Sequence, residues 1–500
     1  MKRFFPTFLF GLSLFSLVSI AIVLSCSREN SAEKSFDQNP AYNYVSELRG
    51  VWLHGAMENW DSTMAALKDA GFNAIFPNMN SGGAALYPSE FLPMTSEKDE
   101  LALCIEAAHN HGIEVHAWRV NWYMMGCPDS FSQAMEKAGR IQYAYNGKRG
   151  WELDWELDRD WLCPSHPDNR KLELDTMLEF VKKYDVDGVH FDYMRYGREE
   201  MCYCRGCKEN FEKETGLKIS RWPDDVWKGG KYREFYLDWR RQLMISSARQ
   251  IARAVHTYDP YVCVSLAARP WTQHAYESDA QVWWEWANEG ILDFICPMNY
   301  TTDPDKFVSI MKEGLPLLKG VIPYYSGIGM YVMKEYPPFK KNVELGRELG
   351  HDGFVAFEIN SLLPVLKEFK TDLTKDMALL PHRAPETHFI LEPGKGETEE
   401  GFLIFAPGEK VKFKVDVMFR AKLREGISRI KGDIVIQTVR GKIVEKIKAL
   451  DLDQASITEV SVTCAKPGRY RLAFYGTMTL STGEEKPFIT TSFPFEISSS

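Results

Sequence analysis

The segment Asp187–Tyr196 reads DGVHFDYMRY. Within it, the ionisable residues His190 and Asp192 alternate with the apolar residues Val189 and Phe191. Alternate side chains of an extended strand share a face, so His190 and Asp192 lie together and the apolar residues between them face the other way. Packing of that apolar face on helices turns His190 and Asp192 toward the interior of the fold. Beside the Arg195 guanidinium, the Asp192 carboxyl is expected to stay ionised, as a nucleophile or cation stabiliser must. The alternative is a buried pair of Asp192 with Arg195 that serves structure alone.

A second ionisable group is needed if Asp192 takes part in acid–base bond cleavage, because one group donates a proton while the other acts as base or nucleophile. Glu358 follows the apolar run 354–357 and is the best-placed acid at another predicted strand end. We expect Glu358 to be the proton donor. Asp303 and Glu58, which follow two other predicted strands, are the alternatives.

Further polar and aromatic side chains lie at or near the ends of several predicted strands. Amide and guanidinium groups bind hydroxyls, and Trp and Tyr rings stack on sugar faces, so their accumulation predicts a carbohydrate-binding cleft. With His190 and Arg195, the predicted substrate-binding residues are Asn78, Trp118, Arg119, Arg269, Asn299, Tyr300 and Tyr325.

Three cysteines, Cys202, Cys204 and Cys207, lie within six residues of one another. Such crowding suits a thiolate cluster around a structural zinc ion, with a fourth ligand from elsewhere in the chain. Cys163 is the preferred fourth ligand, and Cys127 is the alternative. A Cys204–Cys207 disulfide is the competing interpretation in an oxidising compartment. In either case the cluster fixes a loop, and no catalytic cofactor is expected.

Eight short β-rich runs separated by helical patterns position these residues. The count predicts a (β/α)8 barrel over residues 46–378, because parallel strands require such crossovers and barrel enzymes place their sites at the carboxyl ends of the strands. Two doubly wound domains are the alternative, but no glycine-rich phosphate loop follows the first strand. The predicted strands are 49–54, 73–78, 113–118, 187–192, 261–266, 292–297, 320–325 and 352–357.

After Leu379 the pattern changes to a proline-rich linker and then to alternating runs without long helical patterns. The runs are typical of an antiparallel β-sandwich of immunoglobulin or fibronectin type over residues 385–500. No acid–base cluster stands out in this region, so we interpret it as a packing or binding accessory.

The amino terminus has the pattern of an export signal. A basic start, Met1–Arg3, precedes an apolar run that ends in Val23-Leu-Ser-Cys26. This ending resembles a bacterial lipobox and predicts a signal peptide over residues 1–25, lipidation of Cys26 and a polar tether over residues 26–45. The predicted location is the bacterial cell envelope, with the outer membrane as the expected site. An uncleaved membrane anchor is the alternative.

The composition is that of a globular protein. Of 500 residues, 45% are hydrophobic and 26% charged, which excludes a disordered or collagen-like chain. The net charge is −9 and no block of Lys and Arg stands out, so nucleic acid is not an expected partner.

Three motifs together resemble the glycosyl-hydrolase-like family 10: Glu47–Leu53 (ELRGVWL), Pro164–Pro167 (PSHP) and Tyr184–Tyr196. The resemblance covers roughly residues 46 to 375. It implies a secreted or lipid-anchored barrel glycoside hydrolase, and some such proteins act on peptidoglycan glycan strands. It does not fix the sugar. The cysteine cluster resembles the zinc-bound loops of some barrel β-galactosidases.

The strand motif also resembles, in part, the pattern of family 18 chitinases. Asp187 and Asp192 match its acids, but His190 replaces a middle acid and Met194 occupies the place of the proton donor. Residues 298–300 (MNY) resemble those that hold an N-acetyl group. Methionine donates no proton, so that mechanism does not carry over intact.

The sequence therefore predicts a hydrolase of a polysaccharide or cell-wall glycan. The alternatives are a catalytically silent glycan-binding lipoprotein and a scaffold whose sandwich binds a partner protein.

Overall fold

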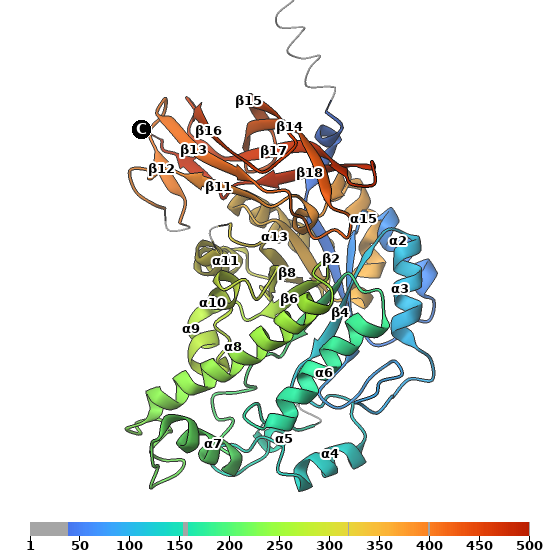
Figure 1. The fold of residues 1–500 in the computed structure, drawn as a ribbon, viewed down its shortest axis with the longest axis vertical. Helices are drawn as coiled ribbons and strands as arrows, with labels where there is room; N and C mark the ends of the chain where they lie inside the picture. Colours follow the sequence, from blue (N-terminus) through green and yellow to red (C-terminus); the bar gives the residue numbers. More distant parts are fainter. Residues whose placement is uncertain (1–38, 154–158, 319, 399–400, 500) are drawn as a thin grey trace, which may run out of the picture.

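The computed structural model describes residues 39–153, 159–318, 320–398 and 401–499, which form a barrel and a β-sandwich packed end to end (Figure 1). The predicted signal peptide, Cys26 and most of the predicted tether lie outside the described residues. Among the residues that are described, no helix is both long and apolar enough to cross a membrane.

Eight parallel strands form the barrel in the order β7-β6-β5-β4-β3-β2-β9-β8. Two parallel bridges, Ile295 with Tyr324 and Met298 with Gly327, bring β8 beside β7 and complete the ring. Almost every strand residue is buried, as expected of strands covered by helices outside and by packed side chains inside. The strands are Leu48–His54 (β2), Ala74–Asn80 (β3), Glu114–Val120 (β4), Gly188–Asp192 (β5), Cys263–Ala268 (β6), Phe294–Pro297 (β7), Tyr325–Gly329 (β8) and Gly353–Phe357 (β9).

The surrounding helices begin and end at the expected kinds of residue. Asn59 caps the first helix by accepting the Ser62 N–H at 3.0 Å. Gly71, with φ of +80°, follows that helix in the left-handed conformation that glycine favours. The main helices are Trp60–Asp69 (α2), Glu100–Asn110 (α3), Asp129–Lys137 (α4), Pro167–Lys183 (α6), Arg205–Thr215 (α7), Arg233–Tyr258 (α8), Trp283–Asn288 (α10), Pro304–Leu318 (α11) and Tyr336–Leu349 (α13). Shorter helical segments are Gly150–Leu153 (α5), Thr272–His274 (α9), Ala275–Asp279 (η2), Met330–Met333 (α12), Ile359–Leu362 (α14), Leu363–Val365 (η3) and Leu366–Thr371 (α15).

The barrel prediction is confirmed, but the seventh strand was placed too early in the sequence. The predicted run 320–325 is replaced by β8, which begins at Tyr325. Gly320, with φ of +79°, lies in a turn after α11, and Pro323 has no N–H to donate to a sheet. As a result, Tyr325 lies at the amino end of its strand, away from the carboxyl ends.

The predicted β-sandwich is also confirmed. One sheet has the order β11-β13-β16, and the other has the order β12-β19-β17-β14-β15, with β18 paired to β17. In β13 the sequence KVKFKVDV buries alternate residues, and Val411, Phe413 and Val415 pack in the core between the sheets. The strands are Thr387–Leu391 (β11), Leu403–Phe405 (β12), Lys410–Val417 (β13), Ile427–Thr438 (β14), Ile443–Leu452 (β15), Ser456–Thr463 (β16), Gly468–Leu480 (β17), Glu485–Thr491 (β18) and Phe495–Ile497 (β19).

The last part of the predicted tether is ordered rather than extended. Pro40–Asn43 forms a short 3-10 helix (η1), and Tyr44–Ser46 (β1) pairs in parallel with Met377–Leu379 (β10). The Asn39 side chain donates to the Tyr475 carbonyl at 3.0 Å, and the Tyr42 hydroxyl donates to Asp433 at 3.0 Å. The described chain therefore starts on the sandwich, which itself packs on the amino ends of the barrel strands.

Candidate active site

A pocket of about 600 Å³ opens at the carboxyl ends of the barrel strands. Seven of the eight strands, all except β3, contribute a residue from their carboxyl end or from just beyond it, which is where barrel enzymes place their chemistry. The lining residues are Trp52, His54, Trp118, Val120, Met125, Asp192, Tyr193, Arg195, Ala267, Arg269, Pro270, Trp271, His274, Met298, Tyr300, Tyr331 and Phe357.

Asp192 is the last residue of β5 and is only 4% exposed. The next residue, Tyr193, has a φ of +54°, a left-handed conformation that is unusual for a non-glycine residue. This turn directs the Tyr193 N–H to Asp192 Oδ1 at 2.7 Å. The Tyr193 backbone conformation therefore helps to hold the carboxyl at the wall of the pocket.

Burial controls the protonation of Asp192. It raises the pKa of the carboxyl to about 6, although the Arg195 charge, the Tyr193 N–H, the Trp118 side chain and the Arg269 charge all act to lower it. At this pKa the carboxyl is protonated in mildly acidic solution and mostly ionised at neutral pH, so the ionised Asp192 expected from the sequence stays a prediction. The desolvation of a carboxyl with 4% exposure outweighs the neighbouring guanidinium.

Two arginines give the pocket its positive charge. Arg269 Nε donates to Asp279 Oδ2 at 2.5 Å, and burial of Asp279 is outweighed by His274, Arg195 and Arg269, which lower its pKa. The Arg195 guanidinium lies over the Tyr193 ring, 4.3 Å from its centroid, and Arg195 is only 6% exposed. Both arginines can donate to oxygen atoms of a ligand in the pocket.

Aromatic rings form much of the remaining wall. Tyr300 and Phe357 stack with their centroids 5.3 Å apart, and Tyr331 meets Phe357 edge-on at 5.4 Å. Trp118 packs on the His54 ring at 4.4 Å. Rings beside hydrogen-bonding groups suit a sugar, which has both apolar faces and hydroxyls.

The structure brings five of the predicted site residues together on this pocket: Asp192, Arg195, Trp118, Arg269 and Tyr300. Sequence reasoning did not select His54, Tyr193, His274, Tyr331 or Phe357 as site residues. The signal that was available for His54 and Phe357 is their position as the final residues of β2 and β9.

Other predicted substrate-binding residues lie inside the barrel, outside the pocket lining. His190 Nε2 accepts from Trp52 Nε1 at 3.0 Å, its Nδ1 lies 2.8 Å from Ser265 Oγ, and burial holds its pKa well below the usual range. Asn78 donates to the carbonyls of Asn80 and Trp118 at 3.0 and 3.2 Å.

Arg119, Asn299 and Tyr325 are also outside the lining and have protein partners. Arg119 is fully buried and forms a two-pronged ion pair with Glu173 at 2.7 and 2.8 Å. Asn299 donates to the Tyr324 hydroxyl at 3.2 Å. Tyr325 lies at the amino end of β8 and its hydroxyl is 2.9 Å from His382 Nδ1.

The three acids considered as partners of Asp192 are also outside the pocket lining. Glu358 directly follows Phe357, is half-buried and accepts from Asn360 Nδ2 at 3.1 Å. Asp303 Oδ1 accepts the Asp305 N–H at 2.9 Å at the start of α11. Glu58 is exposed.

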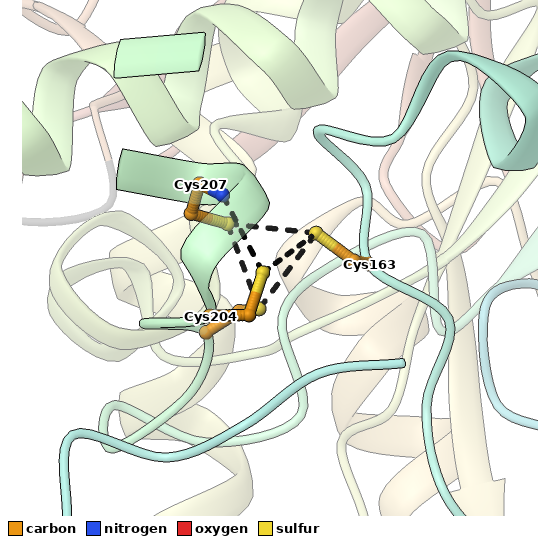
Figure 2. Close-up of side chains that lie close together, drawn as sticks. Cys163, Cys204 and Cys207 are labelled. Carbon is orange, nitrogen blue, oxygen red and sulfur yellow. Dashed lines mark hydrogen bonds between the residues drawn. The ribbon is translucent and has the colours of Figure 1, made fainter. Parts of the chain in front are cut away.

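The four cysteines selected from the sequence meet beside the barrel mouth. Figure 2 shows the sulfur atoms of Cys163, Cys204 and Cys207 pointing toward one another. Cys163 lies between β4 and α6, whereas Cys202, Cys204 and Cys207 lie between β5 and the first turn of α7. The cluster joins the connections that follow β4 and β5. All nine cysteines in the described part of the chain, Cys127 among them, are free thiols.

The donor set fits a tetrahedral metal ion. Cys163 Sγ lies 3.5 Å from both Cys204 Sγ and Cys207 Sγ, and Cys202 Sγ lies 3.8 Å from Cys163 Sγ and 3.6 Å from Cys207 Sγ. Four sulfurs at about 2.3 Å from a central zinc ion would be about 3.8 Å apart. The Cys207 N–H donates to Cys204 Sγ at 3.4 Å, as backbone amides commonly do to metal-bound thiolates.

The fold and the pocket together define a class of protein. A parallel eight-stranded barrel, with a buried carboxyl in an aromatic pocket at the carboxyl ends of its strands, is an architecture of glycoside hydrolases.

Comparison with known proteins agrees. The family model for Glycosyl hydrolase-like 10 matches residues 47–313, more than half of the chain, and the chain belongs to this family. The protein is 26% identical over 343 residues to Glycosyl hydrolase DigH of Escherichia coli (strain K12), covering 57% of this chain and 74% of that protein. It is 23% identical over 302 residues to Glycosyl hydrolase YngK of Bacillus subtilis (strain 168), covering 51% of this chain and 54% of that protein.

Among solved structures, the PgaB (BpsB) glycoside hydrolase domain from Bordetella bronchiseptica aligns with a TM-score of 0.53 and 14% identity. The alignment covers 67% of this chain and 99% of that chain. At this identity the likeness concerns the fold. The family and the fold support a glycosidase type of function.

Proposed function

We propose that the protein hydrolyses O-glycosidic bonds of a polysaccharide or cell-wall glycan strand, and that Asp192 performs the proton transfer. The observation that carries the proposal is a carboxyl with 4% exposure and a pKa of about 6 in the wall of the aromatic pocket. A carboxyl with this pKa keeps its proton at mildly acidic pH and releases it to a leaving oxygen, which is the task of a general acid.

In this proposal the roles expected from the sequence are exchanged. Asp192 is the proton donor, and Glu358 is the base or nucleophile. Going round the ring from β5 through β4, β3 and β2 to β9 takes four steps of eight, so these strands end on opposite sides of the mouth. A sugar bound between the two strand ends would have one carboxyl on each side, as glycoside hydrolysis requires.

The test compares substrates with different leaving groups. Asp192→Asn should lower turnover of a natural glycan by about 10²–10⁴-fold, the usual worth of a general acid, and should have much less effect on aryl glycosides whose phenolate leaves without a proton. Turnover is measured on a panel of polysaccharides and purified peptidoglycan. The exposed Glu368→Gln on α15 is the matched control.

Glu358→Gln tests the role of base or nucleophile separately from that of the proton donor. It should abolish turnover of both substrate types, and added azide should restore the aryl glycoside reaction as a replacement base or nucleophile. Full activity of Glu358→Gln would remove this residue from the proposal and leave Asp192 without an identified partner.

A glycan-binding protein without turnover is the second candidate. It is favoured by one observation: among the described residues that line the pocket, Asp192 is the single carboxyl. Calorimetric titration of glycan fragments, with no products released over long incubation by the parent or by Asp192→Asn, would support binding alone. Turnover that disappears in Asp192→Asn would exclude it.

We also propose that the chain is exported and lipid-anchored through Cys26 in a bacterial cell envelope, with the outer membrane as the site. The support is the basic and apolar amino-terminal pattern that ends in Cys26. Metabolic labelling with a fatty acid should mark the parent and not Cys26→Ala, and fractionation should place the labelled protein in the outer membrane. Labelling of Cys26→Ala would contradict the anchor.

Finally, we propose that Cys163, Cys202, Cys204 and Cys207 hold a structural zinc ion. Four sulfurs that all lie within 4.8 Å of one another support the proposal. The ion would cross-link the connections that follow β4 and β5 and would take no part in the reaction. Elemental analysis should find one zinc per chain, and Cys163→Ser should lower that content.

A further inference from the structure

Arg240 is a fully buried cation without a carboxylate partner. It lies in α8, and no carboxylate of the described residues forms an ion pair with it. Its Nη2 donates to the Ser278 carbonyl at 3.1 Å, but Nε and Nη1 find no acceptor among the described residues. A buried charge that is left unpaired costs several kcal/mol, so a compensating anion is expected close by.

The same face of α8 contacts the cysteine cluster. Tyr236 lies one helical turn before Arg240, and its hydroxyl donates to the Cys202 carbonyl at 2.5 Å. The Arg240 guanidinium covers the Tyr196 ring, 4.0 Å from its centroid. Burial opposes the charge of Arg240, whereas negative charge on Tyr203, Tyr196, Tyr236 or Cys202 favours it and raises its pKa. Arg240 therefore lies within electrostatic reach of the cluster.

The oxidation and metal state of the cluster decides whether Arg240 has a counter-ion. Two disulfides among the four cysteines would be neutral and would leave the guanidinium uncompensated. Four thiolates around one divalent zinc ion carry a net charge of −2, because the ligands bind as thiolates. Of these two states, only the second supplies the missing negative charge.

We propose that Arg240 is the counter-ion of a tetrathiolate zinc centre and raises the affinity of the cluster for the metal. This inference rests on the proposed zinc ion and is independent of hydrolysis. Arg240 is a positioning residue. Among the described residues it does not line the pocket and forms no hydrogen bond with the sulfur atoms of the four cysteines.

The arrangement also connects the cluster to the pocket. The Ser278 carbonyl that accepts from Arg240 precedes Asp279, which pairs with Arg269 in the pocket wall. The Asp279 carbonyl in turn accepts the Tyr196 N–H at 2.9 Å. Loss of the metal would thus loosen the segment that positions Arg269.

The experiment measures metal affinity in the purified full-length protein. Zinc is removed and returned in competition with a chromophoric chelator, and cobalt(II) replaces zinc so that the sulfur-to-metal charge-transfer band reports four thiolate ligands. Arg240→Met should weaken zinc binding by about tenfold or more, because a positive charge beside a dianionic site is lost. Arg240→Lys keeps the charge and should bind zinc more tightly than Arg240→Met. Arg249→Met, on the same helix and paired with Glu289 at the surface, should bind zinc as the parent does.

Each outcome decides a separate point. A parent protein that binds no zinc, or whose cluster is found as disulfides, overturns the inference together with the zinc ion and leaves the hydrolase proposal intact. Equal zinc affinity of the parent and Arg240→Met overturns the role of Arg240 alone. If Arg240→Met does not fold, Arg240→Lys decides: folded protein that retains zinc supports the counter-ion, and folded protein that has lost it contradicts the counter-ion.

Discussion

At the scale of single residues, burial affects the pKa of Asp192 more than the neighbouring positive charges do. The Arg195 and Arg269 guanidinium groups and the Tyr193 N–H all favour the carboxylate, yet the pKa rises to about 6. A carboxyl in this state is costly to ionise and useful as an acid for the same reason. Ionisation of this buried carboxyl at neutral pH therefore lowers the stability of the folded protein, which is the cost of the proton donor that we propose.

This cost predicts a stability change. The folded state binds more protons at Asp192 than the unfolded state between the ordinary pKa of 3.8 and about 6, so stability falls as pH rises through this window. Asp192→Asn removes the penalty and should raise the free energy of unfolding at pH 7.5 by about 1–3 kcal/mol. Urea unfolding at pH 7.5 and at pH 3.5 checks it.

The gain from Asp192→Asn should nearly vanish at pH 3.5, where Asp192 carries its proton in the folded parent and mostly carries it in the unfolded parent. A gain of equal size at both pH values would show that packing, and not ionisation, sets the stability of the variant. Glu368→Gln, at an exposed position, should change neither measurement.

Sequence patterns predicted some site residues and missed others for a physical reason. The period of two along β5 placed Asp192 at a strand end, and Trp118, Arg269 and Tyr300 were found by the same position near strand ends. Arg119 shares that position, but its partner Glu173 is 54 residues away on α6. No local pattern shows which distant side chain will satisfy a polar group.

At the scale of elements, the pair of Arg119 and Glu173 fixes β4 to α6. Both side chains are fully buried. Glu173 also accepts from Asn121 Nδ2 at 2.7 Å and from the Trp122 N–H at 3.1 Å. These bonds hold the segment after β4, next to the pocket wall at Trp118. The pair therefore positions the site without lining it.

Breaking this pair should be costly. Glu173→Leu leaves a buried guanidinium without a carboxylate partner, bonded only to Asn80 Oδ1 and the Ser81 carbonyl, and should destabilise the protein by about 3–5 kcal/mol. The double variant Arg119→Met with Glu173→Leu should recover part of the loss, because no charge is then stranded. Denaturant unfolding of the two single variants and the double variant measures the coupling, and strictly additive losses would contradict the ion pair.

The order of the elements was predictable because helix caps and turn residues separate the strands along the sequence. Seven of the eight predicted strands overlap the observed strands closely. The eighth case, β8, begins at Tyr325 although the apolar residues around Pro323 suggested an earlier strand. An error of five residues along a strand exchanges the two ends of the barrel. For this reason Tyr325 was expected at the carboxyl ends of the strands, whereas it lies at their amino ends, which we call the barrel floor.

At the scale of the whole molecule, a short linker helix fastens the sandwich to the barrel floor. Arg383, in Pro381–Arg383 (η4), donates to Glu114 Oε1 at 2.7 Å and to the carbonyls of Tyr261 and Asp187, both at 3.0 Å. It also donates to the Lys422 carbonyl in the sandwich at 2.5 Å. One guanidinium thus bridges the linker, the barrel and the sandwich.

Removing this bridge should allow the barrel and the sandwich to unfold at different temperatures. The parent should unfold in one transition, and Arg383→Ala should show a lower first transition or two resolved transitions, because interface bonds that couple the domains are lost. Differential scanning calorimetry measures this. Arg420→Ala, an exposed arginine of the sandwich paired with Glu386, is the control. A single, unshifted transition in Arg383→Ala would contradict the coupling.

The position of η1 on the sandwich has a geometric outcome for an anchored protein. The chain enters the fold at the end farthest from the barrel mouth (Figure 1). With a lipid on Cys26, the sandwich would face the bilayer and stand between it and the opening of the pocket. The opening would then look away from the lipid, toward polymer strands lying in the aqueous space, and the length of the molecule would set how far from the bilayer such a strand is reached.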